Sequence, residues 1–579
     1  MNWRFTTFIL LLSFIGFTSV SGQNFLDVNK AEFTERLPER KNAYKQIKNA
    51  ALLYSKGIGF ADQSLVLLLE AHKLNQINPE LNYNIGICYL IAGPKDKALP
   101  FLIDAEKLNP DVSEDIHFLL GLAYQYQNLF SKAITHFKMN IELVQLNKYK
   151  DQKELIALSK KHIVECKSGK KLQTEETTFQ IQLADKVNSI YDDFNPQVFN
   201  DTLYFSSRRE DEKNSRSPRD QKYYERIYVT NIIGDEFGTV DKLTVDIANK
   251  SSVALMSEIN PFQFLFFNGM VGNGDLFYGE KRNSEWKLRK ELKSINEKDS
   301  RESSACIRGN ELYFVSDRKN GFGECDIYVS RKEESGKWGK PINIGGDINT
   351  EYDEGDVFVT SDGQKMFFSS RGHNTIGGYD IFRCERLESG EWGRPQNMGI
   401  PINSTDNDIT YFENKEGKFF FASERSGGDG GFDIYAEKIP DPVQKVEPLE
   451  LVELEEQPIP VIQANEPIEV LKIPVVKRSA GIEEVAMNQE LVEEDFVYRV
   501  QIAACKKEMG PKDLFKRYKG GAVIEHLYVE EWHKYTIGGF ETFEEAAKYR
   551  DDCGVKDAFV VLFKGGYRLG IARKVGGVN

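Results

Sequence analysis

A motif of two short strands joined by a glycine-rich turn recurs five times between residues 175 and 436. Its clearest copy runs from Leu312 to Arg318 with aromatic and small residues in alternation, breaks at a glycine cluster, and resumes at Asp326–Tyr328. Alternation with a period of two predicts strands, and a glycine cluster between two such runs predicts a hairpin. Two weaker copies precede this one and two good copies follow it: residues 203–228, 264–277, 367–382 and 420–435. Repeats of this kind must stack on one another to bury their apolar faces.

A second recurring piece lies between the hairpins. It reads Trp338–Gly345 followed by Asn349 in one unit, and Trp392–Gly399 followed by Asn403 in the next. With this outer strand, each unit has four short strands, which predicts a five-bladed all-β propeller over residues 175–436. The segment Thr178–Asn188 has the pattern of an outer strand with no blade before it, so we expect it to complete the fifth blade and close the ring. A sixth, unrecognised blade is the alternative, and the asparagines that recur once per unit argue against it: Asn188, Asn249, Asn296, Asn349 and Asn403.

The repeats resemble the WD40-like PD40 blades of periplasmic β-propeller proteins, including those related to the Tol-system propeller. Because the charged residues recur in successive units, we interpret them as structural. Arg318 with Asp326, and Arg371 with Asp380, are expected to form ion pairs across the glycine hairpins. The run Asp-Asn-Asp at residues 406–408 lacks the spacing of a calcium loop and is expected to be a solvated turn. No metal site is predicted.

Two segments with a period of 35 residues match a helical-hairpin template. The matching positions are Gly86, Tyr89, Ala98, Leu102, Ala105 and Pro110, then Gly121, Tyr124, Ala133 and Phe137. Glycine and alanine are expected where two helices approach closely, and a polar helix at residues 151–166 is expected to cap the array. Residues 26–168 therefore resemble some three tetratricopeptide (TPR) hairpins. That resemblance implies a concave surface for a peptide or protein, although so short an array can equally be a rigid spacer.

Residues 1–22 have the three parts of a secretory signal peptide. Arg4 lies near the amino end, an apolar run extends from Phe8 to Phe17, and small residues precede an expected cleavage site after Gly22. The first cysteine is Cys88, so we expect no lipoprotein anchor. No later stretch has the apolar length of a membrane span, and a net charge of −14 disfavours nucleic acid as a partner. These features predict a periplasmic protein.

Residues 437–495 differ in composition from everything around them. They contain no aromatic residue, and seven of the chain's 19 prolines lie between Pro440 and Pro474. From Asp441 to Asp495 there are 14 acidic and four basic residues, a local charge of −10. A segment of this composition cannot build a core and predicts an extended, acidic, proline-rich linker without regular structure.

The last segment, residues 496–579, regains a foldable pattern of strand, helix, two strands, helix and strand, the split βαβ order of a small α+β domain. Tyr498–Ala503 and Tyr535–Phe540 resemble the two half-motifs of a SPOR domain, although Ala503-Ala504-Cys505 replaces the usual glycine-aromatic ending of the first half. SPOR domains bind peptidoglycan glycan strands through the open face of the sheet. Alternation then directs Val500, Ile502, Tyr535 and Ile537 toward the helices, and leaves as candidate peptidoglycan contacts Arg499, Gln501, Trp532, Lys534 and Thr536.

The seven cysteines form no CxxC pair, which excludes the usual zinc spacings. Cys505 and Cys553 fall at the same end of the C-terminal domain and are a candidate disulfide, with two free buried thiols as the equal alternative. No nucleophile-elbow, zinc-protease or phosphate-loop motif occurs, and none of the seven histidines forms a helical i, i+4 pair. His526 and His533, on adjacent expected strands, are interpreted as surface residues. We expect no enzyme and no cofactor.

Together these segments are similar to periplasmic envelope proteins associated with type IX secretion and gliding, which join TPR and PD40 domains to a peptidoglycan-binding module. The resemblance implies a non-enzymatic scaffold whose partners are peptidoglycan and periplasmic or membrane-complex proteins. A cell-wall-modifying enzyme or its regulator, targeted by the SPOR-like domain, is the alternative from another class. A periplasmic glycan sensor is a third hypothesis.

Overall fold

The computed structural model describes two compact parts of the chain. They are residues 25–438, with gaps at 34–37, 148–151, 212–214, 218–219, 235, 248–250, 270–273 and 283–284, and residues 496–571, with gaps at 508, 520–523, 530–531, 541–542, 557 and 565–566. The expected signal peptide, and residues 439–495 of the linker expected over 437–495, lie outside the described residues. Among the described helices, none combines the length and apolar character needed to cross a bilayer.

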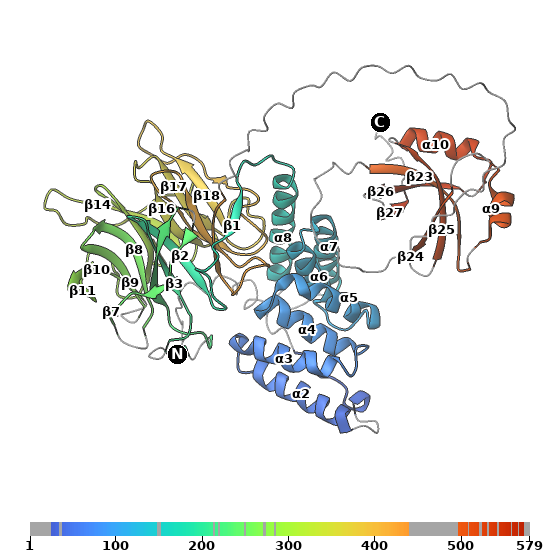
Figure 1. Cartoon of the computed structure of the whole chain (residues 1–579), viewed down its shortest axis with the longest axis horizontal. Coiled ribbons are helices and arrows are strands. Elements are labelled where there is room, and N and C mark those ends of the chain that lie inside the picture. The colour runs from blue at the N-terminus through green and yellow to red at the C-terminus, as the bar shows by residue number, and fades with distance from the viewer. Residues whose placement is uncertain are drawn as a thin grey trace, which may run out of the picture. The chain divides into compact units, whose positions relative to one another are not determined.

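The first part begins with antiparallel helices (Figure 1). Helices α2 (Pro38–Tyr54) and α3 (Ala61–His72), α4 (Pro79–Ala92) and α5 (Ala98–Leu108), and α6 (Ile116–Tyr126) and α7 (Phe130–Asn147) pack in pairs, and α8 (Gln152–Leu172) packs on α7. Short 3-10 turns occur at η2 (Lys30–Phe33), η3 (Ile58–Phe60) and η4 (Lys95–Lys97).

The expected close approach of helices at the repeated glycines is confirmed. A Cβ at Gly86 of α4 would lie 2.5 Å from the side chain of Leu102 on α5. A Cβ at Gly121 of α6 would lie 2.6 Å from the ring of Phe137 on α7. Because each glycine faces the large residue 16 positions later, both hairpins use the same crossing.

The β domain consists of five sheets in the described residues. The first sheet consists of β2 (Asp193–Phe199), β3 (Thr202–Ser207), β4 (Arg226–Ile233) and β5 (Glu236–Phe237), with β6 (Asp241–Lys242) beside β4, and the second consists of β8 (Val253–Asn260), β9 (Gln263–Asn268), β10 (Asp275–Arg282), β11 (Glu285–Glu291) and β7 (Val245–Asp246). The third sheet consists of β12 (Glu302–Arg308), β13 (Glu311–Ser316), β14 (Asp326–Arg331) and β15 (Ile342–Asn343), and the fourth consists of β16 (Glu354–Val359), β17 (Lys365–Ser370), β18 (Asp380–Glu385) and β19 (Gln396–Asn397). The fifth sheet consists of β20 (Asp408–Glu413), β21 (Phe419–Ser423), β22 (Asp433–Glu437) and β1 (Ile181–Leu183).

The five sheets form a closed, propeller-like ring. Their innermost strands contact one another in the cyclic order β2, β8, β12, β16, β20 and back to β2. The expected closure is confirmed, because β1 pairs antiparallel with β22 and so adds the N-terminal strand to the last sheet. Two sheets exceed four strands: β5 continues β4 as a hairpin, and β7 pairs in parallel with the edge strand β11.

The asparagine that recurs once per unit has the same hydrogen-bonding role in each described copy. Asn349 Oδ1 accepts the N–H of Ile327 (2.9 Å), and its Nδ2 donates to the carbonyl of the same residue (2.9 Å). The side chain thus binds the strand after the glycine hairpin as another strand would. The same paired hydrogen bonds join Asn188 to Ile434, Asn296 to Leu276 and Asn403 to Ile381, whereas Asn249 lies outside the described residues.

The ion pairs expected across the glycine hairpins do not form, and this prediction was wrong. Strand β13 ends at Ser316, the register partner of Asp326, so Arg318 lies past the end of the strand. Arg318 instead donates to Glu302, which begins β12 (3.0 Å), while Asp326 accepts the N–H of Phe322 (2.6 Å) and so caps the glycine turn. Asp380 caps its own turn in the same way, accepting the N–H of Ile376 (2.9 Å). The first and fifth sheets repeat the contact between this arginine and the innermost strand, as Arg209–Asp193 and Arg425–Asp408, both at 2.6 Å.

The second part, residues 496–571, is a small α+β domain. Its strands are β23 (Phe496–Cys505), β24 (Ile524–Val529), β25 (Trp532–Phe540), β26 (Phe559–Lys564) and β27 (Tyr567–Ile571), and its helices are α9 (Pro511–Arg517) and α10 (Phe543–Asp552). The antiparallel sheet order β24-β25-β23-β26-β27 is that of a split βαβ fold with one added edge strand, β27, which the sequence did not predict.

Candidate functional site

The helices and the β domain are joined through buried polar contacts. Lys95, in the turn between α4 and α5, donates to Asp406 (2.6 Å) and Glu424 (3.2 Å) of the β domain. Burial opposes the charge on Lys95, but these two carboxylates hold its pKa well above its usual range. On α6, Gln125 Nε2 donates to the carbonyl of Ile376 (2.9 Å), whose side chain packs among the helices.

Residues 406–408 were expected to be solvated, and that prediction was wrong. Asp406, Asn407 and Asp408 are 7%, 3% and 0% exposed. Besides the contact of Asp406 with Lys95, Asn407 donates to Glu424 (2.6 Å), and Asp408 accepts from Arg425 and from the N–H of Ser404 (both 2.6 Å). Asp406 therefore serves the packing of the helices against the β domain, whereas Asn407 and Asp408 are held within the β domain.

A cavity of about 340 Å³ lies beside this contact, between the helices and the loops of the third, fourth and fifth sheets. One wall comes from α6 and α8 and contains apolar groups such as Phe118 and Leu158. The other wall comes from the loops and includes Tyr352 and Arg371. Helix α8, the expected cap, packs on α7 as the last helix of the array and also contributes a wall of this cavity.

A buried carboxylate marks the helical wall of the cavity. Glu165 is 2% exposed and contacts Lys161, His162 Nδ1 (2.7 Å) and Gln125 Nε2 (3.0 Å). Burial alone would raise its pKa, but Lys161 and His162 hold the pKa well below its ordinary value. The carboxylate is thus ionised at neutral pH and fixes Lys161 toward the opposite wall, where the ammonium lies 5.0 Å from the ring centre of Tyr352.

The loop wall carries a second set of charged and aromatic groups. The Arg371 guanidinium lies 5.4 Å from the ring centre of Tyr379, within cation–π range. Burial raises the pKa of Asp353, and the positive charge of Arg371 partly offsets this rise. Asp353 also accepts the N–H of Cys325 (3.2 Å). The cavity therefore presents cationic groups, carboxylates and aromatic faces, a combination suited to a polar organic ligand.

The fourth sheet departs from the repeat where it borders this cavity. Its sequence after the second strand is Ser370-Arg371-Gly372, against Ser316-Asp317-Arg318 in the third. Gly372 occupies the position of the arginine that contacts the innermost strand, and a Cβ there would lie 2.2 Å from Thr350 Oγ1. Arg371 therefore lines the cavity. The signal that sequence reasoning missed was this difference between the repeat copies.

This departure also changes a buried carboxylate. Glu354 is the counterpart of Glu302 and, like it, accepts hydrogen bonds from hydroxyl and backbone donors, here Thr350 and Ser370, while Gly372 stands at the position of the arginine. Burial raises its pKa to about 8. His373 Nε2 lies 2.8 Å from the carbonyl of Ile348, the counterpart of the Ile295 carbonyl that Arg318 binds.

Amide, hydroxyl, thiol and guanidinium side chains bridge neighbouring innermost strands. Asn195 Nδ2 donates to the carbonyl of Leu255 (2.9 Å), and its N–H donates to Thr410 Oγ1 (3.2 Å). Ser257 Oγ accepts the N–H of Ile307 (3.2 Å), and Ser304 Oγ accepts the N–H of Val357 (3.1 Å). These bonds join five strands that share no common ladder.

The C-terminal sheet separates the two sets of residues expected from alternation. Val500, Ile502, Tyr535 and Ile537 are buried in one core with Leu514 and Tyr518, as expected. Of the five candidate ligand contacts, Trp532 is 40% exposed and Arg499 is half-buried and paired with Glu525. The other three candidates are buried: Gln501 is 3% exposed, Lys534 is 8% exposed and Thr536 is 0% exposed. These three residues therefore do not lie on a fully open face of the sheet. Gln501 and Thr536 are register partners on β23 and β25.

The candidate disulfide of this domain is absent. Cys505 and Cys553 are both free thiols, each next to a backbone carbonyl, that of His533 (3.9 Å) and that of Arg550 (3.1 Å). His526 and His533 are half-buried, and their rings stack with centres 5.1 Å apart.

No family model matches the chain, and no curated protein matches it. Solved structures align at low similarity. A prolyl endopeptidase aligns at 12% identity over 39% of this chain and 30% of its own (TM-score 0.23), and the tricorn protease at 13% over 44% and 20% (TM-score 0.21). A hypothetical protein from Leishmania major aligns at 12% over 48% and 95% (TM-score 0.30). The chain thus spans well under half the length of the peptidases it aligns with.

Proposed function

We propose that the chain is a non-enzymatic scaffold of the bacterial periplasm that links peptidoglycan to envelope proteins. In this proposal its SPOR-like domain binds glycan strands. The TPR-like helices and PD40-like propeller bind periplasmic or membrane-complex proteins, with type IX secretion or gliding machinery as the candidate complex. The signal-like residues 1–22 support export to the periplasm.

The observation that carries the wall-binding proposal is the pair of faces of the C-terminal sheet. One face is apolar and packs against the helices, and two polar candidates stay accessible: Trp532, 40% exposed at the start of β25 with the Lys506 ammonium 5.8 Å from its ring centre, and the half-buried Arg499 on β23. An exposed indole offers a flat apolar surface to a sugar ring, and guanidinium and ammonium groups donate hydrogen bonds to hydroxyl and carboxylate oxygens.

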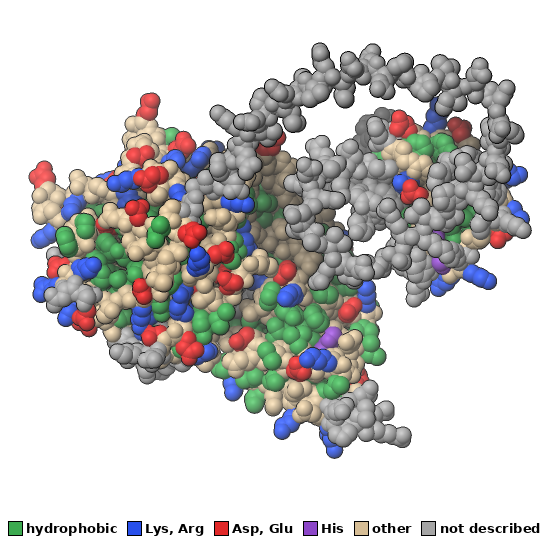
Figure 2. Space-filling model, in the orientation of Figure 1, with side chains coloured by type: hydrophobic (Ala, Val, Ile, Leu, Met, Phe, Trp, Pro, Cys, Tyr) green, Lys and Arg blue, Asp and Glu red, His purple; other side chains and the backbone are tan. Residues whose placement is uncertain are grey.

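Two features of the first part support a scaffold for proteins. Buried ion pairs and hydrogen bonds join the helices and the ring of sheets into one unit, so a partner would meet both at a fixed geometry. Hydrophobic side chains also gather on the visible face over α4 and α5 (Figure 2).

A sacculus pull-down with the chain from Gln23 onward tests the proposal. We expect retention on purified peptidoglycan, a loss of at least tenfold in the double variant Trp532→Ala and Arg499→Ala, and full retention in the control Lys516→Ala on the exposed side of α9. The double variant spares the buried Gln501, so the small domain should stay folded. Equal retention of the wild type and the double variant would reject this face as the binding surface.

The cavity between α8 and the loops favours a second candidate, a sensor of soluble glycan fragments. Its volume of about 340 Å³ fits a small sugar or peptide, and Arg371 and Lys161 offer charge to a carboxylate. Calorimetric titration with muropeptides would separate the two functions, because a sensor should lose binding in Arg371→Ala and keep it in the double variant of the C-terminal face.

A further inference from the structure

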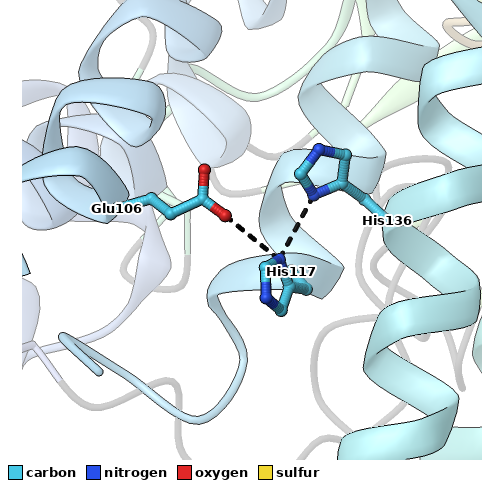
Figure 3. A group of neighbouring side chains, drawn as sticks. All are labelled: Glu106, His117 and His136. Atoms are coloured by element: carbon cyan, nitrogen blue, oxygen red, sulfur yellow. Dashed lines mark hydrogen bonds and ion pairs between the residues drawn. The ribbon is translucent and has the colours of Figure 1, made fainter. Parts of the chain in front are cut away.

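Three helices bring two histidines and a glutamate to one point outside the cavity. Glu106 comes from the end of α5, His117 from the start of α6 and His136 from α7 (Figure 3). His117 Nδ1 lies 3.3 Å from Glu106 Oε1 and 3.2 Å from His136 Nδ1. One ligand atom from each residue lies within 4.8 Å of the other two, and all three residues are half-buried.

This arrangement exceeds what one hydrogen bond explains. A single imidazole nitrogen carries at most one hydrogen, yet His117 Nδ1 lies at similar distances from the Glu106 carboxylate oxygen and from His136 Nδ1. In a tetrahedral zinc site with ligands 2.0–2.1 Å from the metal, neighbouring ligand atoms are about 3.3 Å apart. The separations of 3.3 and 3.2 Å match this spacing, and the third pair of ligand atoms, from Glu106 and His136, lies within 4.8 Å.

We propose that Glu106, His117 and His136 form a site for a divalent transition metal ion, with Zn²⁺ as the best fit. Two imidazole nitrogens and one carboxylate oxygen form a ligand set that zinc accepts, with water completing the tetrahedron. The side chains of Glu106 and His117 are 28% and 13% exposed, so a hydrated ion can reach the site.

The charges around the site decide its affinity. Glu106 supplies one negative charge, whereas the Lys132 ammonium, over the ring of Tyr124, opposes a cation. The Tyr124 ring lies 5.1 Å from that of His136 and restricts its orientation.

Such an ion would act on the helical array as a whole. Glu106 belongs to one hairpin, and His117 and His136 belong to the two helices of the next. The metal would therefore cross-link successive hairpins and fix the angle between them. Because the ion binds only the folded array, it should raise the melting temperature of the first part by a few degrees when present well above its Kd.

The test uses the chain from Gln23 onward, titrated with Zn²⁺ by calorimetry and with Co²⁺ by absorption spectroscopy. We expect one equivalent at this site and the visible bands of tetrahedral Co²⁺. His117→Ala and His136→Ala should abolish both, and Glu106→Gln should weaken Zn²⁺ binding at least tenfold. The matched control is His72→Ala, in a half-buried histidine of α3, which should bind as the wild type does.

Two further variants make the result decisive. Glu106→Gln keeps a partly exposed side chain of the same size, so its melting temperature without metal should equal that of the wild type even if a histidine variant fails to fold. His526→Ala removes the histidine pair of the C-terminal domain as a competing site. Wild-type affinity in Glu106→Gln and His117→Ala, or no binding of either metal by the wild type at millimolar concentration, would overturn the proposal.

Discussion

Asn188 and Ile434 are 246 residues apart and share two hydrogen bonds: Asn188 Nδ2 donates to the Ile434 carbonyl (3.0 Å), and the Ile434 N–H donates to Asn188 Oδ1 (2.8 Å). The equivalent pair Asn403–Ile381 spans only 22 residues. The same side chain that ties each sheet to its own connection therefore ties the two ends of the β domain together. The ring is thus closed by the same pair of asparagine hydrogen bonds that recurs within the repeats.

Asn188→Ala should destabilise the seam of the ring. The change removes two hydrogen bonds and leaves backbone groups of Ile434 unpaired, which should lower the free energy of unfolding by about 2–3 kcal/mol. Hydrogen exchange should accelerate in β1 and β22 first. In the control Asn403→Ala, exchange should accelerate in β18 instead, and unchanged protection of β22 in Asn188→Ala would contradict the closing role.

Gly121→Ala should strain the crossing of α6 and α7. The added methyl would lie 2.6 Å from the Phe137 ring, and overpacking of this kind costs about 1–3 kcal/mol. Denaturant unfolding of the variant should therefore show a lower midpoint. Gly238→Ala is the control, because its Cβ would meet neighbours at an ordinary 3.5 Å. Equal midpoints for both variants would argue that the helices shift apart freely.

The sequence predicted the architecture well because repetition exposes structural constraints. Five copies of one motif located the sheets, and the recurring asparagine located the connection that each sheet needs. It predicted the partners of the repeated charges wrongly, since residue spacing does not reveal that Arg318 lies past the sheet edge and reaches Glu302.

The sites were harder to predict than the fold. The cavity joins α8 to loops more than 150 residues away, so no local pattern contains it. The cluster of Glu106, His117 and His136 likewise arises from three helices and escapes any search for paired ligands on one helix. The missed signal was a difference between copies, Gly372 in place of arginine, which required aligning the units on their strands.

Lys95→Met should destabilise the packing of the helices against the β domain. It leaves Asp406 and Glu424, with side chains 9% and 13% exposed, as unpaired buried carboxylates. Removing one partner of a buried ion pair typically costs 3–5 kcal/mol. The triple variant Lys95→Met, Asp406→Asn and Glu424→Gln should recover part of this loss. The control Lys73→Met, from a pair whose side chains are 66% and 49% exposed, should change stability by less than about 1 kcal/mol.

Stability should fall as pH rises because of Glu354. Its folded-state pKa of about 8 exceeds the ordinary value near 4.3, so the folded chain keeps a proton that the unfolded chain releases. The stabilisation is complete below about pH 4 and is lost as pH rises through 8. Between pH 5.5 and 8.5 the wild type should lose on the order of 3 kcal/mol relative to Glu354→Gln, which keeps a neutral side chain throughout. Glu302→Gln, which leaves Arg318 without its carboxylate, should instead be less stable over the whole range. Parallel curves of unfolding free energy against pH for the wild type and Glu354→Gln would show that this carboxylate is ionised in the folded chain.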